Sequence, residues 1–159
     1  MKKIIKIIGG TMIIAGVGVG VFFGAKAIYN SGVNDGRTAE ANDVSKNVKS
    51  LGTAVSEKET FRKNLNEKLA DIPTELNSDG INSYIEKLNN LINETETESV
   101  KDALNEYLNK WQSFKEVYAG ENNNEIMEKF NELKTSANDT ATKIKSLYDG
   151  AIQEAIQKL

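Results

Sequence analysis

The hydrophobic residues of this 159-residue chain follow two patterns, first continuous and then periodic. Residues 7–25 form a run of about 19 residues without a charge. From Thr38 onward, apolar residues recur every three or four positions, which is the period of an amphipathic helix. No stretch alternates apolar and polar residues as a half-buried strand does. The pattern predicts an all-α chain with an N-terminal hydrophobic segment (1–29), a linker (30–37) and an elongated antiparallel bundle of three to four helices (38–159).

Four apolar stripes divide the periodic region. Pro73 lacks an amide donor and stops the first helix, Gly120 ends the third stripe, and the asparagines at 122–124 can start the last helix. Short connections favour antiparallel neighbours, so the stripes should meet in one thin core. In chain order they contain Ala41, Val44, Val48, Leu51 and Val55; Ile81, Tyr84, Ile85, Leu88, Leu91 and Ile92; Val100, Ala103, Leu104, Tyr107, Leu108 and Trp111; and Ile126, Phe130, Leu133, Ala137 and Ile144.

The middle of the chain allows two interpretations. Ser78 or Asp79 can cap the second helix, and Thr95 with Glu98 has the spacing of a capping box. The stripes on either side of this box are out of phase by about one residue. Residues 79–119 therefore form either one kinked helix or two helices, and the phase shift favours a break.

The N-terminal segment combines a basic start with an apolar run. Lys2, Lys3 and Lys6 precede the run, whose length is close to the ~20 residues that span a bilayer. Secretory signal peptides usually have a shorter apolar region of about 7 to 15 residues, so the length predicts a retained anchor. The basic flank places the N-terminus in the cytoplasm. We expect a single-pass protein of the cell membrane with an extracytoplasmic bundle.

A cleaved signal peptide is the alternative to the anchor. Residues 25–27 read Ala-Lys-Ala, which has the small-x-small form of a signal-peptidase site directly after the apolar run. Cleavage after Ala27 would release the bundle as a secreted protein that begins at Ile28. Under both interpretations the chain is exported.

Three glycines of the apolar run fall on one helical face. Gly16, Gly20 and Gly24 are four residues apart, so in a membrane helix they form a smooth stripe where a second helix can approach closely. Gly9 and Gly10 lie off this stripe. A segment that is rich in glycine throughout needs no dimer face to explain it, so helix packing at these glycines is one of two interpretations.

Charge and residue usage narrow the function. Four of the 20 basic residues (Lys2, Lys3, Lys6 and Lys26) precede Tyr29 and none of the 23 acidic residues does, which leaves a net charge of about −7 after it. This balance argues against nucleic acid as a partner. The chain has no cysteine and no histidine, so it lacks thiolate chemistry and the commonest general base. We expect a protein that is not an enzyme and holds no cofactor, calcium excepted.

One segment resembles an EF-hand calcium loop. Glu75, Asn77, Asp79, Ser83 and Glu86 place oxygen-bearing side chains at loop positions one, three, five, nine and twelve, with a glycine at position six. Three departures weaken the likeness: glutamate at position one, asparagine at position eight in place of an apolar residue, and a proline just before the loop. Helix capping explains the same residues without a metal.

The densest aromatic stripe consists of Tyr107, Trp111, Phe114 and Tyr118. If exposed, it could be a partner surface for a peptide, a glycan or a helix. Its spacing is also that of a buried seam, in which Trp111 would be the core anchor of the bundle.

The sequence leads to a hypothesis of a non-enzymatic, membrane-anchored protein of a bacterial cell envelope. Its partners would be the membrane, through the N-terminal segment, and another protein or its own copies, through the helices of a scaffold or adaptor domain. The alternative is a secreted or anchored ligand-binding module for calcium or a cell-wall component.

Overall fold

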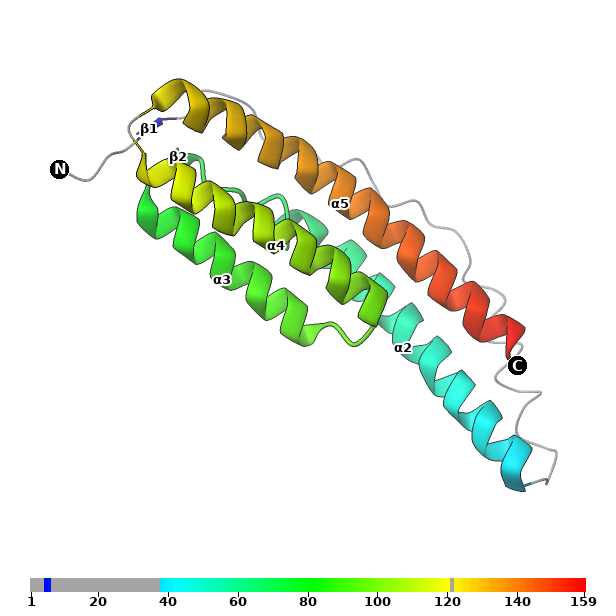
Figure 1. Cartoon of the computed structure of the whole chain (residues 1–159). Coiled ribbons are helices and arrows are strands. Elements are labelled where there is room, and N and C mark those ends of the chain that lie inside the picture. Colours follow the sequence, from blue (N-terminus) through cyan, green and yellow to red (C-terminus); the bar gives the residue numbers. More distant parts are fainter. Residues whose placement is uncertain (1–4, 7–37, 121) are drawn as a thin grey trace.

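The computed structural model describes residues 5–6, 38–120 and 122–159 (Figure 1). The part from 42 to 159 is all-helical except for one two-residue strand, which confirms the helical fold that the hydrophobic pattern predicts. No helix within the described residues has both the length and the apolarity needed to cross a bilayer. The predicted anchor, its glycines and the cleavage site lie outside the described residues.

The described residues form four helices, and consecutive helices run antiparallel (Figure 1). They are α2 (Thr38–Lys68), α3 (Ser78–Glu94), α4 (Glu98–Ala119) and α5 (Asn123–Gln157). The long helices α2 and α5 pack against each other, and the shorter α3 and α4 form a hairpin beside them. Past the α3–α4 loop, α2 and α5 continue as a pair (Figure 1). We call residues 38–56 and 150–159 the two-helix extension; it begins next to Glu57, which binds the α3–α4 loop, and Asp149, which pairs with Lys58.

The described apolar side chains form two separate core clusters. The main cluster lies where all four helices meet and includes the fully buried Trp111, Tyr84, Tyr107 and Phe130. A smaller cluster holds the two-helix extension together and consists of Leu51, Ala54, Ile152 and Ala155, with Val55, Ala151 and Ile156 partly buried against it. The bundle is therefore well packed at one end and thinly packed at the other.

Helix α3 begins where an asparagine supplies its cap. Asn77 has an extended backbone, and its side-chain oxygen accepts a hydrogen bond from the amide of Gly80 at 2.7 Å. This satisfies one of the free amides of the first turn. The predicted caps, Ser78 and Asp79, are wrong: both lie inside the helix. Asn122 caps α5 in the same way through the amide of Glu125, at 3.3 Å, which confirms the predicted start.

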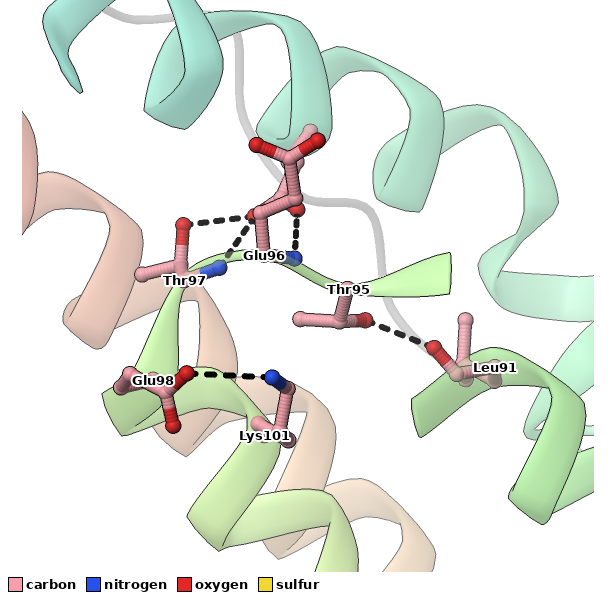
Figure 2. A network of polar contacts seen from close by, with 7 residues as sticks. Leu91, Thr95, Glu96, Thr97, Glu98 and Lys101 are labelled. Carbon is pink, nitrogen blue, oxygen red and sulfur yellow. Dashed lines mark hydrogen bonds and ion pairs between the residues drawn. The ribbon is translucent and has the colours of Figure 1, made fainter. Parts of the chain in front are cut away.

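The chain breaks between α3 and α4, as the phase shift of the stripes predicts. Helix α3 ends at Glu94 and α4 begins at Glu98. Thr95 does not cap α4: its hydroxyl donates to the carbonyl of Leu91 at 2.7 Å, at the end of α3 (Figure 2). The predicted capping box of Thr95 and Glu98 is therefore wrong.

Helix α2 ends at Lys68, five residues before Pro73. Proline disfavours helical geometry in the residue before it, so the helix cannot continue to Pro73 itself. Leu69 is fully buried, and its carbonyl accepts a hydrogen bond from the hydroxyl of Tyr84 at 2.5 Å. This bond satisfies a buried carbonyl outside the helix and fixes the α2–α3 connection to the core.

A short antiparallel strand pair joins β1 (Ile5–Lys6) to β2 (Glu75–Leu76). Ile5 lies opposite Leu76, and Lys6 lies opposite Glu75. The hydrophobic pattern predicts no strand, so it misses this pairing. Two residues are too few for the alternation by which a strand is recognised in a sequence.

Candidate functional site

A hollow of about 420 Å³ lies between α2 and the α3–α4 loop. Helix α2 lines it with small and polar residues, among them Gly52, Ser56 and Thr60, while Phe61 and Tyr148 add apolar surface. The hollow exists because α2 packs closely on α5 and makes few contacts with α3. Its volume is within the range of small-molecule pockets. This hollow is the candidate site of the described residues.

Glu57 of α2 binds the α3–α4 loop across this hollow. Its carboxylate accepts hydrogen bonds from the amide of Thr97 at 3.1 Å, from the hydroxyl of Thr97 at 2.6 Å and from the amide of Glu96. The two loop residues and their donor groups are seen in Figure 2. Thr97 is the N-cap residue of α4 and makes no side-chain cap of its own. Glu57 therefore supplies from another helix the cap, and the negative charge, that the start of α4 requires.

Ionic and polar contacts surround Glu57. Lys68 pairs with Glu94 at the rim of the hollow, and Lys58 pairs with Asp149 between α2 and α5. Burial raises the pKa of the Tyr148 hydroxyl, and the negative charge of Glu57 beside it raises that pKa further. Tyr148 therefore stays neutral at all physiological pH values. The hollow is held in shape by contacts that connect α2, α5 and the loop.

The chemistry available in the hollow is hydrogen bonding. Its lining includes the carboxylates of Glu57, Glu94 and Glu96 against the single cation Lys68. Glu57 and Lys68 both make the contacts described above, so their charges already serve the fold. A polar ligand with donor groups would match the lining.

Further hollows lie on the described bundle, among them the following pair. One of about 400 Å³ flanks the two-helix extension directly beyond the α3–α4 loop, where Asn47, Lys49 and Ala54 of α2 face Ala151 and Ala155 of α5. The other, of about 460 Å³, lies between α4 and α5 and is lined by Lys110, Phe114 and Leu133 among others.

The residues of the predicted calcium loop do not form a loop. Glu75 lies in strand β2, Asn77 uses its side-chain oxygen as the cap of α3, and Asp79, Ser83 and Glu86 lie on α3. An EF-hand would need these residues to wrap around an ion. Within the described residues, no group of three His, Cys, Asp or Glu side chains is arranged to hold a metal. The geometry gives the calcium interpretation no support.

The structure buries the aromatic stripe. Tyr107, Trp111, Phe114 and Tyr118 are between 0 and 6 % exposed. The Trp111 ring lies 5.8 Å from that of Phe114 and 6.3 Å from that of Phe130. These are the edge-on contacts of an aromatic core, so the stripe is a seam of the bundle and not a surface open to a partner.

Glu57 is the residue of this site that the sequence analysis missed. It stands 40 positions from Thr97, so no local spacing connects the two. The other predicted site residues, Gly16, Gly20 and Gly24, lie outside the described residues. Comparisons of the chain with protein-family models, curated proteins and solved structures found no match.

Proposed function

We propose that this chain is a non-enzymatic protein of a bacterial cell envelope, anchored in the membrane by residues 7–25, whose extracytoplasmic bundle binds another protein or further copies of itself. The carrying observation is the uncharged run of about 19 residues that follows three lysines and precedes a folded helical region. Its strongly apolar members contribute about −3 to −5 kcal/mol to insertion, before the unfavourable effect of the glycines.

Membrane insertion and the β1–β2 pairing exclude each other. If residues 7–25 span the bilayer, Ile5–Lys6 lie on the cytoplasmic side and Glu75–Leu76 on the other. A backbone hydrogen bond contributes about 1 kcal/mol net, and a two-residue strand pair has only a few. The proposal therefore requires that the pairing opens when the segment enters the lipid.

Binding is favoured over catalysis by the residue types of the chain. The absence of histidine and cysteine from the sequence removes the usual general base and nucleophile. Burial raises the pKa values of Tyr84 and Tyr107, because it disfavours the charged form. Both hydroxyls therefore stay protonated at neutral pH and cannot take up a proton as a general base does. The charged side chains on the helices could pair with complementary charges of another protein.

Fractionation of a bacterium that produces the full chain tests the proposal. We expect the protein to stay in the membrane pellet after a carbonate wash. In spheroplasts, protease added from outside should degrade the bundle. Edman sequencing should start at or next to Met1; a start at Ile28 with release of the protein would identify a secreted domain instead. Recovery in the cytosolic fraction, or a bundle that is protected until the membrane is dissolved, would overturn the proposal.

A further inference from the structure

The two-helix extension is the part of the described bundle that lies beyond α3 and α4 (Figure 1). The hydrogen bond from the Asn47 side-chain amide to the carbonyl of Lys158, at 3.0 Å, ties the end of α5 to α2. Beyond it, residues 38–46 of α2 continue past the end of α5 (Figure 1). Short helical segments without a packed neighbour are marginal in water. This end of the bundle would gain stability from an additional helix pair.

The distribution of charge divides the bundle at the same point. The extension holds three acidic residues (Glu40, Asp43 and Glu154) and three basic residues (Lys46, Lys49 and Lys158), so its net charge is zero. Residues 57–149 hold 19 acidic and 12 basic residues, a net charge of about −7. Two copies of this chain would repel each other through the four-helix part and would not through the extension.

The hollow on the flank of the extension carries charges of both signs. Its lining includes two lysines, Lys49 and Lys158, and two glutamates, Glu96 and Glu154, around the alanines of both helices. Lys158 and Glu154 pair with each other within one chain. An isologous interface uses the same surface of both copies, so a two-fold axis beside this hollow would allow Lys49 of one copy to pair with Glu96 of the other. The alanines leave room for the second backbone to come close.

We propose that the extension of a second copy of this chain occupies this hollow, so that two extensions complete a four-helix arrangement next to the membrane. The proposal rests on the proposed membrane anchor. The eight residues of the linker 30–37 span at most about 28 Å, which keeps the extension close to the bilayer. Confinement of both copies to one membrane, with the same orientation, raises their effective concentration at this surface.

Single cysteines test the interface, because the natural chain has none. The full chain carrying Ser50→Cys, whose side chain lines the hollow, is reconstituted in vesicles of phosphatidylcholine and phosphatidylglycerol and oxidised. We expect a disulfide-linked dimer of about 35 kDa, twice the 17.5 kDa of the chain. Ser113→Cys, exposed on α4 in the four-helix part, is the matched control and should stay monomeric. Equal crosslinking of both variants, or none from Ser50→Cys, would overturn the interface.

A charge substitution then separates this interface from the alternatives. Thr53→Arg places a bulky cation in the hollow and should lower the crosslinked fraction of Ser50→Cys about tenfold, while Thr135→Arg, at an exposed position of α5, should not change it. Loss of the dimer in Gly20→Leu but not in Thr53→Arg would assign association to the membrane segment and overturn the proposal. A chain that stays out of the vesicles contradicts the anchor alone, since the same variants still report dimers when oxidised in solution.

Discussion

Glu57 connects two parts of the chain that are 40 residues apart. An N-cap is normally supplied by the residue at the helix start, but Thr97 donates its own hydroxyl to Glu57. The carboxylate can accept several hydrogen bonds at once, whereas a threonine cap satisfies one amide. The start of α4 therefore depends on a residue of α2, and the position of α2 depends on the loop.

Replacement of Glu57 by alanine should destabilise the protein by about 1.5–3 kcal/mol, because two backbone amides and one hydroxyl lose a charged acceptor. Glu57→Gln retains one acceptor oxygen and should have about half this effect. Urea denaturation followed by circular dichroism measures the free energy of unfolding. Glu59→Ala is the matched control: its weak pair with Arg62, at 3.6 Å on the surface, predicts a change below about 0.5 kcal/mol. Equal losses for both alanine variants would show that Glu57 is not a cap.

At the scale of the helices, the period of apolar residues predicts the buried faces better than capping residues predict the helix ends. In α3, α4 and α5, most apolar residues spaced three or four positions apart are buried. This agrees with the spacing because a helix in a bundle is stabilised by the burial of one face. Trp111 and Phe130 could be placed in the core on this ground alone. The helix ends were harder to predict, since Asn77, Ser78 and Asp79 are all good caps and only the geometry of the chain decides among them.

The candidate site could not be predicted for a related reason. The hollow beside Glu57 depends on the distance between α2 and the α3–α4 loop, and no spacing within α2 encodes this distance. Lys68, Glu94 and Tyr148 come from three different helices and meet only after packing. Local patterns in the sequence carry no information on such pairs.

The seam between α3 and α4 makes stability sensitive to alkali. Burial raises the pKa of Tyr84 far above its ordinary value, and the nearby Tyr107 raises it further; burial also raises the pKa of Tyr107. A tyrosine in the unfolded chain titrates near pH 10. The folded state holds its protons more tightly, so the stability that these groups provide is fully present below about pH 10 and is lost as the pH rises above it.

We therefore expect the free energy of unfolding to fall between pH 10 and pH 11 much more steeply than between pH 8 and pH 9. In Tyr84→Phe this alkaline slope should be smaller, because one of the buried hydroxyls is gone. The same variant should lose about 1 kcal/mol at pH 7, where the carbonyl of Leu69 no longer receives its hydrogen bond. Urea titrations at the four pH values provide the measurement, and parallel curves for both proteins would contradict the assignment to Tyr84.

At the scale of the whole molecule, the extension and the four-helix part differ in both core and charge. Among its described side chains the extension has four buried apolar residues, and its net charge is zero, whereas the rest of the bundle holds the main core and the acidic surface. Because the four-helix part is acidic and the extension is not, a second copy can approach this molecule with the least repulsion at the extension. Helix α2 begins at Thr38, directly after the linker in the sequence, so the proposed anchor would lie at the end that needs stabilisation.

The β1–β2 pairing provides a direct test of how the whole chain is arranged. Lys6 and Glu75 are opposite each other in the strand register, and the chain has no other cysteine to interfere with a disulfide between these positions. In the double variant Lys6→Cys/Glu75→Cys, the two thiols can meet only if both strands lie on the same side of the membrane. Protein made in the bacterium and extracted from its membranes should therefore contain no intramolecular disulfide, because the anchor would separate the thiols. The same variant synthesised without membranes should form the disulfide on oxidation, since the pairing then stays closed. A disulfide in the membrane-extracted protein would place the N-terminus beside the bundle and exclude the anchored topology, whatever the fractionation shows.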